Sequence, residues 1–291
     1  MIILRLKGGL GNQLFQYAFA RTIALRTNRQ LYLDLGYLTL AKYRFTPRDF
    51  KLERLGNYKL VDGSIETSYN EFHAAGHTAY IYEHFDKDKV WATIDNPEMK
   101  AILLDGYFQD QFYFTPFLNQ IRNEFKSFLN SYYPSRNLSG DLINSRRQTV
   151  AVHLRRTDYL QPSILHTHGI CEADYYQQAV AIMKSRLSSP YFYIFSDDTQ
   201  EADRLFSNLL KEQTNISVIL QQAPSKDNDL IELALMSRCK NFIIANSSFS
   251  WWGSYLSDAD PKLVVAPKQW LLSENLRREA EGIVLQSWIR I

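Results

Sequence analysis

Residues Val150 to Tyr159 form an apolar run that ends in two arginines and an aspartate. A run of this length predicts a buried strand, and the buried strands of open α/β sheets carry their chemistry at the carboxyl end. Arg155 and Arg156 would therefore lie at a strand tip, where a desolvated guanidinium group needs an anionic partner. Because this planar group with five donors matches phosphate and carboxylate oxygens, the run predicts an anionic ligand above the strand.

The two arginines should have different roles, because side chains alternate along a strand. Arg155 shares a face with His153, while Arg156 points to the opposite face. We expect Arg155 to contact the ligand, with Arg156 and Asp158 holding the turn. The alternative is a structural cluster in which arginines pair with aspartates at the end of the sheet.

A second predicted strand ends at Phe195 and is followed by Ser196, Asp197 and Asp198. The two carboxylates could bind a metal ion in the manner of a D-x-D site. Adjacent aspartates lack that spacing, however, and Asp198 alone could cap the helix that follows. We therefore favour capping over metal binding at this strand end.

A third predicted strand ends at Ala245 and leads into Asn246, Ser247 and Ser248, after which a helix begins. Hydroxyl groups and the unpaired N–H groups of a helix start converge there, as they do in a phosphate site. Ser247 or Ser248 could also act as a plain N-cap, and that role is compatible with ligand binding.

The chain begins with a strand, Ile2 to Leu6, that enters the glycine turn Gly8-Gly9-Leu10-Gly11-Asn12-Gln13. A helix of period 3.6 is predicted from Asn12 to Thr27. The N–H groups of its first turn suit an anion or a sugar hydroxyl. The turn lacks the third glycine of the dinucleotide fingerprint, and a purely structural turn is the alternative.

The elements that must position these residues are clearest in the second half of the chain. Strands are predicted at 149–154, 191–195, 216–220, 242–245 and 263–266, and helices at 172–187, 200–211, 229–237 and 249–256. Such alternation indicates a parallel sheet with helices on both faces. In the first half, strands are predicted at 30–34 and 101–107 and an amphipathic helix at 115–130, whereas residues 35–96 sustain no period.

The polar stretch from Pro134 to Gln148 is the best linker candidate in the chain. We therefore predict two domains, an α/β domain over residues 1–145 and a Rossmann-like domain over residues 146–291. No stretch is apolar enough to span a bilayer, and the start lacks a secretory signal. These features predict a soluble cytoplasmic protein, with peripheral attachment to the inner membrane left open.

The composition excludes some partners and metal sites. A formal net charge of +2 provides no field that would steer the chain onto nucleic acid. Cys171 and Cys239 fall in predicted helices, match no metal spacing and favour a reducing compartment. His73, His77 and His84 are expected to be surface or packing residues rather than metal ligands.

Several motifs, taken in order along the chain, resemble one enzyme family. His153-x-Arg155-Arg156-x-Asp158 resembles the signature of α1,2- and α1,6-fucosyltransferases and protein O-fucosyltransferases. The glycine turn, Phe195-Ser196-Asp197-Asp198 and Ile244-Ala245-Asn246-Ser247-Ser248-Phe249-Ser250-Trp251-Trp252-Gly253 resemble the bacterial α1,2-fucosyltransferases of glycosyltransferase family 11. Gly106-Tyr107-Phe108-Gln109 and Ala266-Pro267-Lys268-x-Trp270 extend this resemblance, which runs from residue 3 to about residue 270.

The resemblance implies a GT-B architecture of two facing Rossmann-like domains. GDP-fucose would bind mainly to the C-terminal domain, and fucose would be transferred with inversion, without a metal ion or another cofactor. By motif, the residues expected at the donor are Arg155 on the β-phosphate, His153, Arg156 and Asp158 in support, Ser247 and Ser248 at the helix start, Ser196, Asp197 and Asn246 at strand ends, and Gly9, Gly11 and Asn12 from the other domain. Arg155, His153 and Asn12 are the predicted catalytic residues among them.

The family also carries an aspartate where Glu232 stands in this chain. A carboxylate there could accept both N1–H and the exocyclic amine of guanine, while it would repel the N1 acceptor of adenine. Asp229, one turn earlier, is the substitute, and either residue could instead be an ordinary solvated helix residue.

The leading hypothesis is an α1,2-fucosyltransferase acting on a galactose-terminated oligosaccharide or lipid-linked glycan. Breaking the fucose–phosphate bond adds negative charge to GDP, which Arg155 could stabilise in the transition state. A general base for the acceptor hydroxyl is not assigned, although Asp34, Asp105 and Asp110 are available. The alternatives are a transferase making an α1,6 or α1,3 linkage and a non-catalytic regulator that binds a GDP-sugar.

Overall fold

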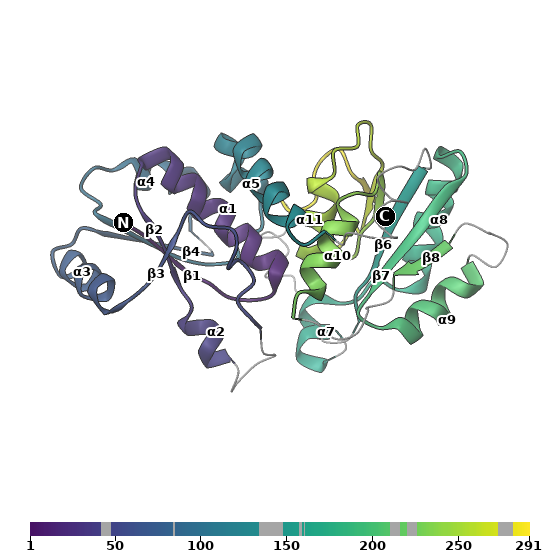
Figure 1. The fold of residues 1–291 in the computed structure, drawn as a ribbon, viewed down its shortest axis with the longest axis horizontal. Helices are drawn as coiled ribbons and strands as arrows, with labels where there is room; N and C mark the ends of the chain where they lie inside the picture. Colours follow the sequence, from purple (N-terminus) through teal and green to yellow (C-terminus); the bar gives the residue numbers. More distant parts are fainter. Residues whose placement is uncertain are drawn as a thin grey trace. The chain divides into compact units, whose positions relative to one another are not determined.

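The structure, a computed structural model, describes residues 1–41, 48–83, 85–133, 148–156, 159, 161–209, 216–219, 226–272 and 282–291. The chain divides into two compact units, Met1–Phe125 and Lys126–Ile291 (Figure 1). The predicted domain boundary between residues 145 and 146 falls outside the described residues and stays a prediction. None of the described helices combines the length and apolar composition that a bilayer-spanning segment requires.

The first unit alternates strands and helices from its start. Its elements are β1 (Ile2–Arg5), α1 (Leu10–Thr27), β2 (Leu31–Asp34), α2 (Gly36–Ala41), β3 (Lys59–Leu60), α3 (Gly63–Ala74), β4 (Thr78–Tyr82), α4 (Lys87–Asp95), β5 (Ala101–Asp105), the 3₁₀ turns η1 (Gln111–Tyr113) and η2 (Thr115–Phe117), and α5 (Leu118–Asn130), whose last turns belong to the second unit.

The strands of the first unit form a parallel sheet in the order β3-β2-β1-β5-β4. The central strands bury one face of this sheet, as Ile2, Leu4 and Leu104 show, and α1 packs against β1 and β2. Since the chain adds β2 and β3 on one side of β1 and β5 on the other, the strand order reverses between β1 and β5. Ligands of open α/β sheets bind at such a reversal, beyond the carboxyl ends of the strands.

The predicted strands of this unit and its first helix are confirmed to within a few residues, but residues 35–96 hold elements that no sequence pattern predicted. β3 has only two residues, both exposed, and α3 has no buried residue, so neither buries a hydrophobic stripe. β4 and α4 each bury only two residues. Patterns this short do not stand out in the sequence, and tertiary pairing decides the structure of these elements.

The second unit follows the predicted alternation closely. Its elements are β6 (Gln148–Leu154), α7 (Pro162–His168), α8 (Ala173–Arg186), β7 (Pro190–Ser196), α9 (Thr199–Leu209), β8 (Ile216–Ile219), α10 (Asn228–Met236), β9 (Asn241–Ile243), α11 (Ser248–Leu256), β10 (Val264–Ala266) and β11 (Ile289–Arg290). The five predicted strands and four predicted helices are all present. Among the described residues of this unit, α7 and β11 are the elements additional to the prediction.

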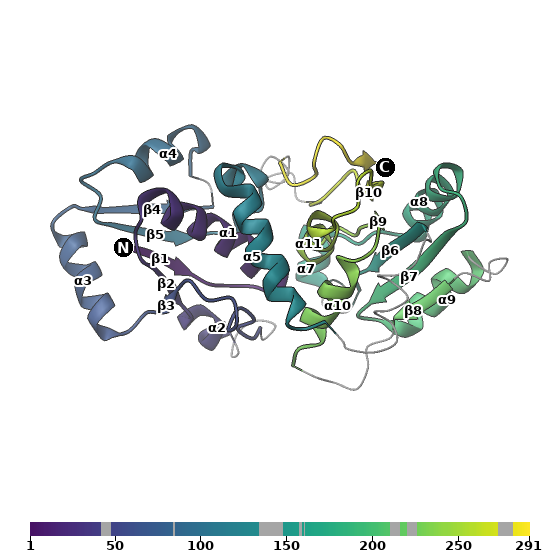
Figure 2. The ribbon, with the colours of Figure 1, turned by 45° about the horizontal axis from the view of Figure 1, so that its top comes forward.

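The strands of the second unit form a parallel sheet in the order β11-β10-β9-β6-β7-β8. Helices α8 and α9 lie on one face of the sheet and α10 and α11 on the other (Figure 2). Strand order reverses between β6 and β9, so their carboxyl ends form the expected ligand position in this unit.

The prediction that both cysteines lie in helices is wrong. Cys171 precedes α8 and Cys239 follows α10, and both are buried free thiols. Burial raises the pKa of Cys171 to about 12, so this thiol stays protonated at neutral pH and is a poor nucleophile.

Candidate functional site

The candidate site of the second unit lies where β6 and β9 end side by side. Val152 of β6 pairs with Ile243 of β9, so the residues that follow the two strands emerge at the same edge. Arg155 and Arg156 follow β6, and the turn that starts α11 follows β9. The tertiary structure thus brings two of the three predicted strand tips together at the reversal of strand order.

Arg155 is held at this edge by the third tip. Its Nη1 lies 2.9 Å from Oδ2 of Asp197, which follows β7, and its guanidinium group stands 5.6 Å from the ring centroid of Tyr159. The Tyr159 hydroxyl in turn donates to the carbonyl oxygen of Asn246, at 3.2 Å. Tyr159, which sequence reasoning did not single out, therefore links the tips of β6 and β9.

Arg156 has a different environment from Arg155. Its side chain is only 4% exposed, and its Nε lies 3.8 Å from Oε1 of Glu201 in α9. Its backbone N–H donates to Oδ1 of Asp197 at 2.8 Å, so one carboxylate holds both arginines. Arg156 therefore stabilises the turn from inside, while Arg155 is the more accessible cation. Asp158 lies outside the described residues.

His153 is buried directly below the start of α11, with its ring centroid 5.4 Å from that of Phe249. Burial, and next the positive charge of Arg155, lower the pKa of His153 to about 3. The imidazole is therefore neutral at physiological pH and adds no charge to the site. Within the described part of the chain, its Nδ1 has no hydrogen-bond partner, which is unfavourable for a buried polar atom unless a ligand supplies one.

Ser247 is the N-cap of α11, but its side chain makes no capping hydrogen bond. Its backbone N–H donates instead to the carbonyl oxygen of Ala245, at 2.8 Å. The expected plain capping by Ser247 is thus absent, and Ser248 is the first residue of the helix. A helix start without its side-chain cap keeps the partial positive charge that favours phosphate.

Two other predicted donor-binding residues, Asn246 and Ser196, use their side chains within the protein. The Asn246 amide nitrogen lies 2.8 Å from the carbonyl oxygen of His168 and 3.3 Å from those of Gly169 and Trp270. The Ser196 hydroxyl donates to the carbonyl oxygen of Asp198 at 2.8 Å. Asn246 therefore connects three loops, and Ser196 closes the turn after β7.

Asp198 acts as the predicted helix cap, because its Oδ1 accepts the backbone N–H of Glu201 at 2.9 Å. Asp197 is occupied by the two arginines. No group of three or more histidine, cysteine, aspartate or glutamate side chains that could hold a metal ion occurs among the described residues.

In the first unit, the glycine turn leads directly into α1. Gly8 has a φ of +79°, which is strained for any residue with a Cβ, and Gly9 is the N-cap of α1. The buried Gln16 side chain accepts the Lys7 N–H at 3.0 Å and donates to the Lys7 carbonyl oxygen at 2.8 Å. Gly11 is buried in the first turn of the helix, so its role is in packing the turn.

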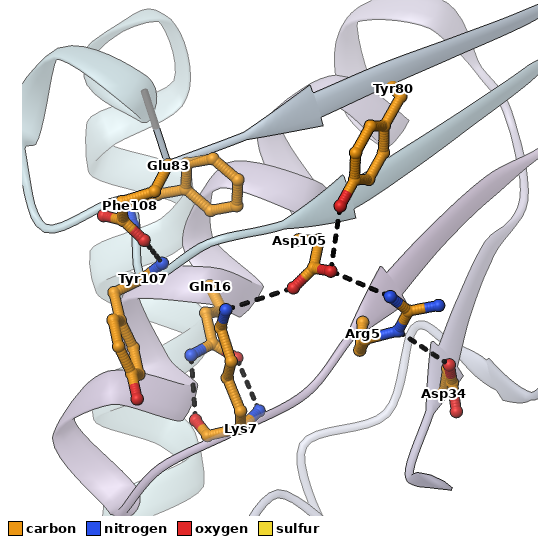
Figure 3. Close-up of polar contacts among 9 residues, drawn as sticks. All are labelled: Arg5, Lys7, Gln16, Asp34, Tyr80, Glu83, Asp105, Tyr107 and Phe108. Carbon is orange, nitrogen blue, oxygen red and sulfur yellow. Dashed lines mark hydrogen bonds and ion pairs between the residues drawn. The ribbon is translucent and has the colours of Figure 1, made fainter. Parts of the chain in front are cut away.

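Asn12 is oriented by a second segment, the loop after β5. Gln109 Nε2 donates to Asn12 Oδ1 at 2.6 Å, which leaves the Asn12 amide nitrogen turned away from Gln109. The loop itself is fixed by Glu83, whose carboxylate accepts the backbone N–H groups of Tyr107 and Phe108 (Figure 3). The sequence motifs predict Asn12 near the donor, but they include Gln109 only as part of a motif and indicate no role for Gln109 or Glu83. These contacts join segments that lie far apart in the chain, so no local pattern indicates them.

Comparison with known proteins decides the family. The family model described as glycosyl transferase family 11 matches residues 4–291. The chain belongs to glycosyltransferase family 11.

Proteins similar to this chain occur in bacteria and in mammals. Two Escherichia coli proteins, the O-antigen biosynthesis glycosyltransferase WbnK and an alpha-1,2-colitosyltransferase, are each 28% identical to this chain and match 98% and 100% of it, covering 99% of their own lengths. Galactoside alpha-(1,2)-fucosyltransferase 1 of Bos taurus is 28% identical over 87% of this chain and 66% of its own.

The fold is also found in a solved structure. A mutant of Arabidopsis thaliana FUT1 in complex with GDP superposes with a TM-score of 0.54 over 94% of this chain and 72% of its own, at 14% identity. The two units, each with a parallel sheet between helices, have the GT-B fold predicted from the sequence.

A cluster of charged side chains lies at the carboxyl edge of the first sheet in this family 11 protein (Figure 3). Asp105 pairs with Arg5 at 2.8 Å and with Lys7 at 3.1 Å. Burial raises the pKa of the Asp105 carboxyl, but the hydrogen bond and charge of Lys7, with Tyr80 and Arg5, outweigh burial and hold this pKa below its usual range. Asp105 is therefore a weak candidate for a general base.

The other two carboxylates considered as bases also have structural partners. Asp34 Oδ2 lies 3.4 Å from Arg5 Nε, and its Oδ1 accepts the Gly36 N–H at 2.8 Å. Asp110 Oδ1 accepts the Phe112 N–H at 2.8 Å, and its Oδ2 pairs with Lys87 at 2.5 Å. Each carboxylate thus holds a turn or an ion pair.

The two candidates for guanine recognition both lie on α10. Asp229 is in its first turn and accepts the Leu230 N–H on Oδ1 at 3.0 Å, whereas Glu232 is half-buried one turn further along. α10 packs against α11, the helix whose Phe249 ring lies beside His153. Both carboxylates therefore remain candidates in this family 11 protein.

Proposed function

We propose that this chain is an inverting α1,2-fucosyltransferase that moves L-fucose from GDP-β-L-fucose to a galactose-terminated glycan without a metal ion. One observation carries the proposal. In a family 11 chain, the accessible Arg155 follows β6, and the start of α11, which has no side-chain cap, follows the adjacent strand β9 at the reversal of strand order. A guanidinium group and a helix start together suit a diphosphate.

The relatives support the choice of linkage and acceptor class. The name of one full-length relative specifies an alpha-1,2 transfer, and the Bos taurus relative acts on galactosides with the same regiochemistry. Another full-length relative takes part in O-antigen biosynthesis, which supports a surface polysaccharide precursor as the natural acceptor.

The proposed mechanism follows from where charge develops. As the fucose–phosphate bond breaks, the sugar becomes cation-like and GDP gains negative charge, so a fixed cation at the β-phosphate stabilises the transition state more than the ground state. Arg155 provides this cation, and Asp197 and Tyr159 hold it in place. Neutral His153 adds a hydrogen-bonding group below the helix start without repelling the cation-like sugar.

A second candidate function differs only in the donor sugar. The alpha-1,2-colitosyltransferase matches the whole length of the chain as well as any relative named above. A GDP-linked sugar other than fucose is therefore a specific alternative, and it would use the same phosphate contacts.

One incubation series separates these possibilities. The purified chain is incubated with labelled GDP-fucose or GDP-colitose and with lactose, N-acetyllactosamine or Gal-β1,3-GalNAc, and product linkage is determined by NMR. We expect a fucosyl group on O2 of galactose and unchanged activity in excess EDTA. A 3- or 6-linked product would overturn the proposed α1,2 linkage. A preference for GDP-colitose would overturn the assignment of GDP-fucose as the donor. GDP binding without any product would favour a non-catalytic regulator. Loss of activity in EDTA that Mn²⁺ restores would refute metal independence.

A further inference from the structure

The edge strand β4 of the first unit exposes two tyrosine rings on one face of the sheet. Ala79 and Ile81 are buried, whereas Tyr80 and Tyr82, which alternate with them, are 48% and 43% exposed. The two rings lie side by side, with centroids 5.7 Å apart and planes inclined by 33°. Neighbouring tyrosine rings that are half exposed form an apolar shelf at the protein surface.

Tyr80 of this shelf borders the charged cluster at the carboxyl ends of the neighbouring strands (Figure 3). The Tyr80 hydroxyl donates to Asp105 Oδ2 at 3.0 Å, the same oxygen that accepts Arg5 Nη1 at 2.8 Å. Arg5 also reaches Asp34, and its side chain is 38% exposed. Polar groups that solvent can reach therefore stand beside the aromatic rings.

The net charge of this cluster restricts what it can bind. Arg5 and Lys7 supply two positive charges, and Asp34 and Asp105 supply two negative charges, so the cluster is neutral overall. A neutral cluster gives no net attraction for a phosphate or a nucleic acid. A neutral ligand with many hydroxyl groups would instead find donors on Arg5 and acceptors on the carboxylates.

The position within the sheet is also that of a ligand site. Arg5 and Asp105 end β1 and β5, the two strands between which the strand order reverses. Lys7, bound to Asp105, lies 5.1 Å from the ring centroid of Tyr107 and directly precedes the glycine turn. The shelf is thus connected through side-chain contacts to the edge where an open α/β sheet binds ligands.

We infer that Tyr80, Tyr82 and the neighbouring Arg5–Asp105 pair form a subsite for a neutral acceptor saccharide. The rings would pack on the C–H face of a galactose or of the sugar next to it, and the charged pair would hydrogen-bond its hydroxyl groups. The inference rests on the proposed function, because it assigns the acceptor of that same transfer. In this arrangement Asp105 positions the acceptor and does not remove its proton, in agreement with its ion pairs.

The test measures acceptor and donor use separately. Transfer to N-acetyllactosamine gives the acceptor KM, while GDP affinity by calorimetry and slow hydrolysis of GDP-fucose without acceptor report on the donor site. Tyr80→Ala and Tyr82→Ala should each raise the acceptor KM roughly three- to ten-fold, the scale of one lost aromatic contact, with GDP affinity and hydrolysis unchanged. Tyr80→Phe keeps the ring and removes only the hydrogen bond to Asp105, so its effect should be smaller.

Leu60→Ala is the matched control, because Leu60 is 50% exposed on β3 at the opposite edge of the same sheet. It should leave the acceptor KM unchanged. An unchanged KM in both tyrosine-to-alanine variants would overturn the subsite, as would an equal rise in Leu60→Ala. A changed sedimentation coefficient in the tyrosine variants, without a change in KM, would identify the shelf as a contact between protein copies and also overturn the inference.

A direct binding measurement keeps this test distinct from the test of the proposed function. Saturation-transfer NMR of N-acetyllactosamine with the GDP-loaded protein should show binding that Tyr80→Ala weakens. If the wild type shows this binding but forms no product, the proposed function fails and the subsite stands. If the wild type transfers fucose but Tyr80→Ala weakens neither binding nor KM, the subsite fails and the proposed function stands.

Discussion

Replacing Arg155 with alanine should lower kcat/KM for fucose transfer by roughly 30- to 900-fold, or about 2–4 kcal/mol of transition-state stabilisation. The structure supports a free-energy loss in this range, which is larger than the contribution of an exposed surface ion pair. The Arg155 side chain is 23% exposed and is held 2.9 Å from Asp197, so solvent screens it only partly and it needs little reorganisation. A guanidinium group can hold Asp197 and a phosphate oxygen at the same time, because it has five donors.

Arg155→Lys should recover little of this loss, because a point charge on a flexible chain replaces neither the planar group nor its contact with the Tyr159 ring. The assay compares kcat/KM for transfer with the Kd of GDP by calorimetry. Since the cation acts mainly on charge that grows during bond cleavage, the loss in kcat/KM should exceed the loss in GDP affinity.

Arg186→Ala provides the matched control, since Arg186 is an exposed residue at the end of α8 in the same unit. This variant also removes an arginine side chain, and it should leave both kcat/KM for fucose transfer and the Kd of GDP unchanged. The reasoning is refuted if Arg155→Ala transfers fucose with near-wild-type kcat/KM. It is refuted equally if GDP affinity falls by as much as kcat/KM, since Arg155 would then stabilise the ground state alone.

Three further predictions concern guanine, the Asn12 amide and acid stability. Glu232→Ala should weaken GDP binding by about 1.5–3 kcal/mol and narrow the preference for GDP over ADP in calorimetric titrations, as expected for a lost hydrogen bond to a charged group. If this variant binds GDP normally and Asp229→Ala does not, the guanine contact belongs to Asp229. Gln109→Ala removes the 2.6 Å contact that orients Asn12 and should lower kcat while GDP affinity stays unchanged; a parallel loss of both would argue for a general disturbance of the fold. The pKa of His153 is about 3 in the folded chain against an ordinary value of 6.5, so between these values the unfolded chain binds a proton that the folded chain does not. The free energy of unfolding should therefore fall as the pH drops below 6.5. In a plot of the urea midpoint of unfolding against pH, His153→Gln should reduce the slope below pH 6.5. An equally steep slope in the variant would assign the acid sensitivity to other groups.

The sequence by itself determined the architecture of the second unit. Strands β6, β7, β9 and β10 are buried on both faces and helix α8 buries one stripe, so hydrophobic runs and the 3.6-residue period identify them without tertiary information. The same local patterns located the strand tips that carry Arg155, Asp197 and Ser247, because polar residues directly after an apolar run mark the end of a strand. The glycine turn before α1 was predictable for a similar reason, since Gly8 occupies a backbone conformation that other residues rarely adopt.

Tertiary structure alone decided which of these residues are neighbours. Strand order placed the end of β9 beside that of β6, and no local pattern encodes that order. It also decided that the Asn246 side chain connects three loops, that Gln109 orients Asn12, and that Asp105 pairs with two cations. The physical reason is that burial periodicity is a property of one segment, whereas a hydrogen bond or an ion pair between strands depends on the free energy of packing the whole sheet.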